Sequence, residues 1–362
     1  MKVVFVTQTL DPGHPALAQT LDLARALAAR VDELAIVTRE TRWDDPPANA
    51  VVRTFDARSR PRRTLAFEAA LFASARDADA ILVHMVPQFA LLASPLARIR
   101  RIPLLLWYTH WHRSRALRLA TRVVDAALSV DASSYPVATP KLHSIGHAID
   151  VDLFAAAPAR DADGPFRVLA LGRTARWKGL GTLLDAVERC ADLTLEIRGP
   201  SLTPDEEQHR RELAARVDGD PRLAGRVRIA EPVARAEIPG LIASVDAVVS
   251  PNEPRAGATL DKAVFEAAAC ARPVVSTNAG FAPLLGRLPL ELIAPPRDPG
   301  ALAGALAALA RSSAAERDAV GAELRRRVVA HHSLSHWADS VIDVAREVRS
   351  PGGTAGSAGA AG

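Results

Sequence analysis

Three basic residues stand among glycines in GRTARWKGLG, residues 172–181. The run before this segment is apolar, as in a strand, and the run after it has the spacing of an amphipathic helix. The segment is therefore expected at a helix N-terminus, where unpaired backbone N–H groups attract anions. Arg173 offers a planar fork of donors and Lys178 a compact charge, and together they suit a diphosphate. Taken alone, the segment fits a solvated basic loop equally well.

The glycines of this segment are expected to shape the turn. Gly172 ends the strand and permits a tight turn, while Gly179 and Gly181 allow close backbone approach at the first turn of the helix. Arg176 precedes Trp177 and is expected to point elsewhere on the loop. Arg173 and Lys178 are therefore the candidates for chemistry.

A second candidate is Glu266, in the run FEAAACARPVVST at 265–277. A carboxylate in an otherwise apolar helix faces burial and needs hydrogen-bond donors, and sugar hydroxyls are good donors to it. The alternative is a glutamate on the exposed stripe of the helix. The residues alone leave both interpretations open.

Short apolar runs alternate with helical patterns along the whole chain, which is typical of parallel sheets covered on both faces. The segment AAAPARDADGPF, residues 155–166, interrupts this alternation and has the composition of a linker. The expected fold class is α/β with two doubly wound domains, and ligands are expected at the carboxyl ends of the strands, in the cleft between the domains. The expected boundaries are 1–155 for the first domain, 156–165 for the linker, 166–348 for the second domain with a closing C-terminal helix, and 349–362 for a disordered tail.

Composition limits the classes of protein. A chain of 362 residues with 49% hydrophobic and 24% charged residues fits a globular protein of roughly two domains. The net charge of +4 is too small to indicate a nucleic-acid partner. Cys190 and Cys270 lack CxxC spacing and are expected as free thiols in a reducing compartment. No segment has the pattern of a signal peptide or of a membrane span, which predicts a cytoplasmic protein.

A basic run precedes an amphipathic one in the first half of the chain. Arg58, Arg60, Arg62 and Arg63 stand before TLAFEAALFASA, residues 64–75. Basic residues beside an apolar helix face suit anionic lipid and a lipid-linked acceptor. The run therefore predicts either a peripheral position on the inner face of the plasma membrane or an ordinary surface helix with a solvated start.

The segments GRTARWKG and FEAAACARPVVST, in this order, resemble the GT-B glycosyltransferases of family 4, also called group 1. IGHAIDVDLF at 145–154, PVARAEIPGLIASVDAVVSPN at 232–252 and LLLWYTH at 104–110 resemble further segments of that family. The resemblance implies two Rossmann-like domains facing a central cleft, the first binding an acceptor and the second a nucleotide-sugar donor. The implied enzyme is a retaining, hexosyltransferase-like transferase that glycosylates a sugar, glycolipid or other hydroxyl acceptor without a metal or a cofactor.

The resemblance also implies roles for single residues. Arg173 and Lys178 would bind the donor diphosphate and stabilise it as a leaving group, and Glu266 would hold the nucleotide ribose. His110 matches the histidine that the family places near the transferred sugar and requires for catalysis. Gly13, in LDPGHP, stands where the family has a glycine turn near the phosphates.

One departure from the family pattern concerns the donor sugar. The family has a second glutamate eight positions before Glu266, and this chain has Ala258 there. Lys262 is then expected at the diphosphate, or Asp261 takes the place of the missing carboxylate at the sugar, beside Gly257 and Ala258. Two alternatives follow: a non-hydrolysing nucleotide-sugar epimerase on the same fold, or a catalytically inactive subunit that binds nucleotide-sugar.

The segment HWH, residues 110–112, leaves a further alternative. In an extended strand its two imidazoles would lie on one face, and with His84 on a neighbouring strand they could ligate zinc. The favoured interpretation is a catalytic His110, with His84 and His112 on the acceptor side and no metal.

Overall fold

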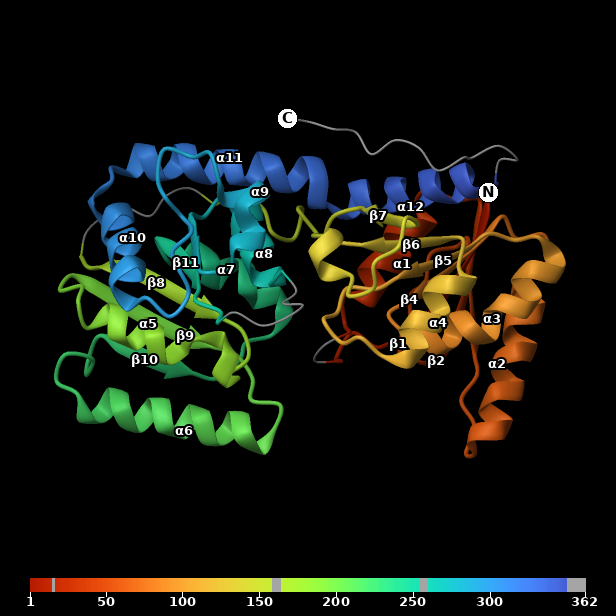
Figure 1. Ribbon diagram of the computed structural model, residues 1–362, viewed down its shortest axis with the longest axis horizontal. Coiled ribbons are helices and arrows are strands. Elements are labelled where there is room, and N and C mark those ends of the chain that lie inside the picture. The colour runs from red at the N-terminus through yellow and green to blue at the C-terminus, as the bar shows by residue number, and fades with distance from the viewer. Residues whose placement is uncertain (15–16, 158–163, 254–259, 350–362) are drawn as a thin grey trace. The chain divides into compact units, whose positions relative to one another are not determined.

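The computed structural model describes residues 1–14, 17–157, 164–253 and 260–349 of the chain. It divides into two compact units (Figure 1). The N-terminal unit comprises Met1–Ala148 and the chain from Leu334 onward, and the C-terminal unit comprises Ile149–Ser333. Each unit is a parallel β-sheet with helices packed against it, so the predicted α/β class is confirmed.

In the described part of the N-terminal unit, seven parallel strands form one sheet in the order β3-β2-β1-β4-β5-β6-β7. The strands are β1 (Lys2–Leu10), β2 (Glu33–Thr41), β3 (Ala50–Thr54), β4 (Ala80–His84), β5 (Leu104–Trp107), β6 (Ala126–Ser129) and β7 (Leu142–Ser144). Val3 of β1 lies opposite Leu34 of β2 and Ala80 of β4, so β1 is an inner strand. The strand order reverses between β1 and β4, and open α/β sheets bind ligands beyond the strand ends at such a reversal.

Helices cover both faces of this sheet. On one face lie α1 (Thr20–Ala28) and α12 (Leu334–Arg349), and on the other lie α2 (Arg60–Ser74), α3 (Pro87–Arg100) and α4 (Arg115–Val123). Strand residues such as Val4 and Ile81 share one hydrophobic core with Phe67 of α2, Ala93 of α3 and Leu117 of α4. The solvent-facing side chains of α2, α3 and α4 therefore form one outer layer.

The last helix belongs to the N-terminal unit. α12 packs against α1, and Trp337 contacts Trp107 of β5 edge-on, with 5.8 Å between the ring centroids. This placement corrects the expectation that the helix closes the C-terminal domain, and the first unit ends at Ala148 rather than at residue 155. Helical periodicity reveals the apolar face of a helix, but it does not reveal which sheet that face covers.

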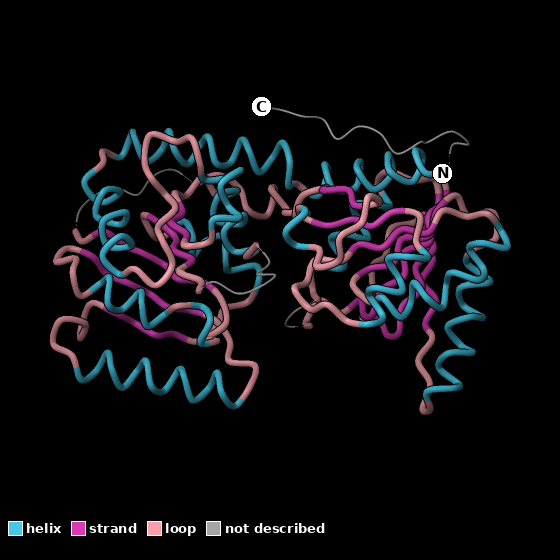
Figure 2. Tube along the Cα trace, viewed as in Figure 1, coloured by secondary structure: helices cyan, strands magenta, loops and turns pink. Residues whose placement is uncertain are grey.

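The described C-terminal unit contains a sheet of five parallel strands in the order β10-β9-β8-β11-β12. These are β8 (Phe166–Leu171), β9 (Leu193–Arg198), β10 (Val227–Ala230), β11 (Ala247–Ser250) and β12 (Val274–Ser276). The helices of this unit are α5 (Leu180–Val187), α6 (Pro204–Gly219), α7 (Ile238–Ala243), α8 (Lys262–Ala269), α9 (Ala282–Leu285), α10 (Pro299–Arg311) and α11 (Ala314–His332). Figure 2 shows that in each unit the strands lie among the helices.

Three of the described elements have little signal in the sequence: α3, β7 and α10. α3 begins at Pro87 and contains Pro95, and prolines usually mark the end of a helix. Pro87 is tolerated because the first turn of a helix needs no N–H partner there. β7 is short and α10 is rich in alanine and glycine, so neither has a marked periodicity.

The remaining expectations concern the cysteines, membrane-spanning helices, and the linker and tail. Cys190 and Cys270 are free thiols, as predicted. Among the described helices, none has both the length and the hydropathy needed to cross a bilayer. Most of the predicted linker and nearly all of the predicted tail lie outside the described residues.

Candidate functional site

The strand order of the C-terminal unit reverses between β8 and β11. The chain passes from β8 to β9 on one side, while β11 pairs with the other side of β8. The loops after β8 and β11 therefore diverge and leave a hollow at the carboxyl ends of the strands. Residues of both loops and the residue before α8 line this hollow: Gly172, Arg173, Lys178, Ser250, Asn252 and Asp261.

The two loops leave the strand ends in different directions but come into contact at Gly179. Gly179 has φ 66°, and a Cβ there would lie 1.9 Å from the carbonyl oxygen of Pro251 in the loop after β11. Gly172 has φ 145°, a backbone conformation that favours glycine. A Cβ at Gly181 would meet nothing within 4 Å among the described atoms, so no neighbouring segment requires glycine there.

Lys178 and Asp261 form the centre of the hollow. Lys178 Nζ lies 2.6 Å from Asp261 Oδ2, and their side chains are 12% and 14% exposed. The same carboxylate oxygen accepts hydrogen bonds from Ser250 Oγ at 3.0 Å and from Asn252 Nδ2 at 2.6 Å. Three donors on one oxygen fix the orientation of Asp261 and, through it, the position of the Lys178 ammonium group.

Asn252 carries an acceptor without a described partner. The residue is 4% exposed, and its side-chain Oδ1 forms no hydrogen bond with any described residue. Its amide nitrogen is committed to Asp261, and its backbone carbonyl accepts a hydrogen bond from Thr277 Oγ1 at 2.6 Å. A buried amide oxygen is costly to leave unsatisfied, so this atom favours a ligand or water that donates a hydrogen bond.

Arg173 is held by a buried carboxylate of α6, Glu206. Its Nε donates to Glu206 Oε2 at 3.3 Å and its Nη2 donates to Glu206 Oε1. Glu206 is 4% exposed and accepts a further bond from the backbone N–H of Leu202 at 2.7 Å. Because the pairing uses one side of the guanidinium, Nη1 is left to reach another anion.

Arg176 points away from the hollow, as predicted. Its guanidinium donates to Glu212 at 2.9 Å and to Asp205 at 3.2 Å, both on α6. The hydrogen bond from Arg176 lowers the pKa of the Glu212 carboxyl to about 2. The charge of Arg176 is therefore used in holding α6.

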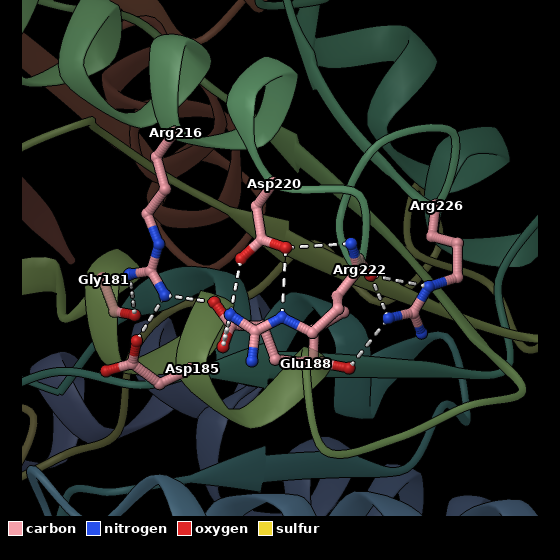
Figure 3. Close-up of polar contacts among 8 residues, drawn as sticks. Gly181, Asp185, Glu188, Arg216, Asp220, Arg222 and Arg226 are labelled. Atoms are coloured by element: carbon pink, nitrogen blue, oxygen red, sulfur yellow. Dashed lines mark hydrogen bonds and ion pairs between the residues drawn. The ribbon is translucent and has the colours of Figure 1, made fainter.

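Arginines also fix the helix that follows the basic loop (Figure 3). Arg216 of α6 donates to Asp185 of α5, to Glu188 after its end and to the carbonyl of Gly181 in its first turn. Arg222 pairs with Glu188 at 3.0 Å. α5 is thus tied at both ends, and its N-terminus is held at the loop that carries Lys178.

Glu266 lies in the same unit, one helical turn beyond Lys262. It is 6% exposed, so the interpretation as an exposed-stripe residue is wrong. Its Oε1 lies 3.3 Å from Arg235 Nη1 and 3.5 Å from Lys262 Nζ. A buried carboxylate beside two cations can accept hydrogen bonds from ligand hydroxyls.

Three of the predicted residues do not belong to the described part of the C-terminal unit. Gly257 and Ala258 lie outside the described residues. Gly13 belongs to the N-terminal unit, in the loop after β1, where its N–H donates to Asp11 Oδ1 at 2.8 Å. The structure thus brings together Arg173, Lys178 and Asp261, with Lys262 next to Asp261 and Glu266 one helical turn farther along α8.

His84 ends β4, beside the strand reversal of the N-terminal unit. It is 3% exposed, and its Nδ1 lies 3.0 Å from the hydroxyl of Thr7 on β1. Burial lowers the pKa of His84 to about 4, so the ring is neutral at pH 7. This ring belongs to the core, not to an open acceptor surface as the sequence analysis expected.

His110 follows β5 by three residues. Its ring stacks on Trp111, with centroids 5.2 Å apart, and its Nδ1 accepts a hydrogen bond from the backbone N–H of His112 at 3.0 Å. This bond requires a local turn, so HWH is not the extended strand that the zinc interpretation needs. No group of three or more His, Cys, Asp or Glu among the described residues is arranged to hold a metal ion. His112 is exposed.

Four residues of the candidate site were missed from the sequence: Glu206, Arg235, Ser250 and Asn252. Ser250 and Asn252 lie in the SPN segment directly after a predicted strand, and that position could have indicated them. Glu206 and Arg235 are remote in sequence from their partners, and no local signal predicts these pairs.

Comparison with known families identifies the C-terminal unit. Residues 165–312 match the family model for glycosyl transferases group 1. The matched residues lie in the C-terminal unit, which is similar in sequence to group 1 glycosyl transferases. This match confirms the family that the sequence motifs indicated, while none of the curated protein sequences is similar enough to count as a match.

Solved structures extend the likeness to both units of this chain. Sucrose-phosphate synthase of Thermosynechococcus elongatus has a TM-score of 0.73 at 18% identity, over 96% of this chain and 98% of that one. HepE of Anabaena, solved with UDP and glucose, has a TM-score of 0.71 at 18% identity, over 95% and 98%. A glycosyltransferase of Rickettsia africae has a TM-score of 0.74 at 15% identity, over 97% and 99%. At these identities the likeness shows the fold, and the predicted GT-B fold is confirmed.

Proposed function

We propose that the protein transfers a hexosyl group from a nucleotide-diphosphate donor to a hydroxyl acceptor. The observation that carries this proposal is the hollow between β8 and β11, where Lys178 pairs with the largely buried carboxylate of Asp261 and Arg173 lines the same hollow. Two cations at a strand reversal suit a diphosphate, and a carboxylate next to them suits sugar hydroxyls. The complex of HepE with UDP and glucose supports a donor of this class.

Lys178 and Arg173 are proposed to act on the leaving group. The bond between the anomeric carbon and the β-phosphate oxygen breaks, and its electron pair stays on that oxygen. Preorganised cations in a water-poor site stabilise this charge more strongly as it develops than in the resting donor. The acceptor oxygen bonds to the anomeric carbon, and its proton passes to the departing phosphate. Because these cations do the work of a metal ion, we propose a metal-independent reaction.

We assign one carboxylate to the transferred sugar of the donor and another to the ribose of its nucleotide. Asp261 lies beside Lys178 and is proposed to accept hydrogen bonds from the transferred sugar, in place of the glutamate that Ala258 replaces. The free Oδ1 of Asn252 is proposed to accept another. Glu266, between Arg235 and Lys262, is proposed to hold the nucleotide ribose. Lys262, Gly13 and Gly257 remain candidates for the diphosphate and sugar.

The N-terminal unit is proposed to bind the acceptor. His110 stands just beyond the carboxyl end of β5, where a side chain can contact a ligand. Its Nδ1 accepts the His112 N–H, so a neutral ring carries its proton on Nε2 and can donate to a sugar oxygen. We propose His110 as a catalytic residue at the transferred sugar and His112 on the acceptor side, with retention of configuration as in the enzymes that the motifs resemble. The arginines at 58–63 suit an acceptor presented at an anionic lipid surface.

Product analysis tests this proposal. The purified chain is incubated with UDP-, GDP- and ADP-hexoses, with and without simple glycoside acceptors and with EDTA, and products are identified by mass spectrometry and NMR. A new glycoside that forms only with acceptor and survives EDTA is the expected result. An epimerised nucleotide-sugar without acceptor would identify an epimerase, and tight donor binding without any product would identify an inactive binding subunit.

A further inference from the structure

The outer layer formed by α2, α3 and α4 carries charge of one sign. These helices contain eight arginines, Arg60, Arg62, Arg63, Arg98, Arg100, Arg115, Arg118 and Arg122, and one acidic residue, Glu68. All three helices pack on the same hydrophobic core, so their outward side chains share one surface. The whole chain is nearly balanced in charge, which makes this layer exceptional within it.

Almost none of this charge is neutralised within the protein. Of the eight arginines, Arg63 alone forms an ion pair with a described residue, at 3.7 Å from Asp56. In the C-terminal unit, by contrast, Arg176, Arg216 and Arg222 are each held by two carboxylates. The arginines of α2, α3 and α4 therefore remain available to an external anion.

Large apolar side chains are exposed among these arginines. Leu65 and Phe72 of α2 are 70% and 60% exposed, Ile99 of α3 is 81% exposed and Leu119 of α4 is 49% exposed. Leu65 and Phe72 are seven residues apart, so they lie on one face of α2. The guanidinium of Arg100 lies 4.2 Å from the ring centre of Phe72, which places charge and apolar surface in contact across α2 and α3.

We propose that this layer docks the protein on an anionic lipid bilayer. The arginines would contact lipid phosphates, and Leu65, Phe72, Ile99 and Leu119 would enter the boundary between headgroups and acyl chains. Nucleic acid would satisfy the arginines but would not bury these side chains, so lipid is the partner that fits both features. The proposal stands independently of sugar transfer, because docking needs neither donor nor acceptor.

Sedimentation of the full chain with vesicles tests this proposal. The vesicles consist of phosphatidylcholine alone or mixed with phosphatidylglycerol, and no nucleotide-sugar is present. The charge variant combines R62E, R98E and R118E. Its control combines R189E, R228E and R311E, which changes the net charge equally at exposed, unpaired arginines of the C-terminal unit. A second variant, L65S with I99S, leaves the charge unchanged.

The expected result is sedimentation of the wild type with the mixed vesicles only. Each arginine near an anionic surface raises partitioning about fivefold, so the charge variant should bind at least about 100-fold more weakly, while the control binds like the wild type. L65S with I99S should weaken binding at least about tenfold, as expected for apolar side chains that enter the membrane. Wild type that stays in the supernatant overturns the proposal. The proposal is also overturned if the control variant loses as much vesicle binding as the charge variant. It is overturned as well if L65S with I99S leaves vesicle binding unchanged and the wild type binds single-stranded RNA as tightly as the mixed vesicles.

Discussion

The two strand reversals of this chain share a topology and differ in their chemistry. Beyond β8 and β11, the C-terminal unit gathers Lys178 and Arg173 against buried carboxylates. At the end of β4, beside β1, the N-terminal unit has a hydroxyl and an imidazole kept neutral by burial, those of Thr7 and His84. The side chains that meet at the first reversal are fully charged, and the Thr7–His84 pair at the second is uncharged.

This difference fits the proposal that the C-terminal unit binds the donor and the N-terminal unit binds the acceptor. A diphosphate leaving group carries negative charge that grows as its bond breaks, so it calls for fixed cations. A hydroxyl acceptor is uncharged, and charges at its site would gain little and would have to be desolvated. The predictions below change residues of one unit at a time.

The largest effect is expected from Lys178→Ala. Removing a preorganised partner of developing charge commonly lowers turnover about 10²- to 10³-fold, and the loss in donor binding should be smaller. Arg173→Ala should act similarly. Arg176→Ala is the matched control from the same loop and should stay near wild type, because its guanidinium is held by α6. Steady-state kinetics on variants with unchanged melting temperature measure these effects. A strict need for Mg²⁺, with Lys178→Ala and Arg173→Ala unimpaired, would contradict the assignment.

The buried, neutral ring of His84 should make the free energy of unfolding depend on pH. The pKa of His84 is about 4 when folded and near 6.5 when unfolded, so below pH 6.5 the unfolded chain takes up a proton that the folded chain resists. Stability is therefore lost as pH falls from 6.5 to about 4. Between pH 7 and pH 4.5 the wild type should lose roughly 2 kcal/mol more than His84→Gln.

Urea unfolding followed by tryptophan fluorescence measures this loss, because Trp107 and Trp337 are buried in the N-terminal unit. The difference between wild type and His84→Gln removes the contribution of carboxylates, which titrate in both proteins. Equal losses in the two proteins would show that His84 is not held neutral.

His110→Ala tests the proposed catalytic residue of the N-terminal unit. Its interaction is expected mainly in the transition state, so turnover should fall about 10²-fold while donor affinity changes little. His143→Ala, on β7, is the control. Metal analysis of the purified proteins accompanies the kinetics. Zinc that is bound by the wild type and lost together with activity would restore the metal interpretation of HWH.

Glu266→Gln should have the smallest effect. The substitution keeps the shape of the side chain but removes the charge that accepts ribose hydrogen bonds, which should weaken nucleotide binding by roughly 1–3 kcal/mol. Calorimetric titration with nucleoside diphosphates measures the change. Glu207→Gln, on the exposed face of α6, is the control. Unchanged affinity in a folded Glu266→Gln variant would assign this carboxylate a purely structural role with Arg235.

The sequence predicted the parts of the site that depend on local pattern. Short stretches of sequence were enough to indicate the basic loop with its glycines, Glu266 in its apolar helix, and the strand ends. The Arg173–Glu206 pair, the donors that Ser250 and Asn252 give to Asp261, and the burial of His84 depend on contacts between distant segments. α12 shows the same limit, because its apolar face was predictable and its host sheet was not.

A thermal-shift screen of nucleotide-sugars against wild type, Lys178→Ala and Arg176→Ala tests the central claim most directly, that the hollow between β8 and β11 holds a nucleotide diphosphate. A ligand that binds only the folded state stabilises it by about 2.7 kcal/mol at a concentration 100 times its Kd. We predict that at least one nucleoside diphosphate-hexose raises the melting temperature of wild type and Arg176→Ala, and that Lys178→Ala loses most of this increase. The claim is contradicted if no nucleotide-sugar stabilises the wild type, or if Lys178→Ala is stabilised as strongly as Arg176→Ala.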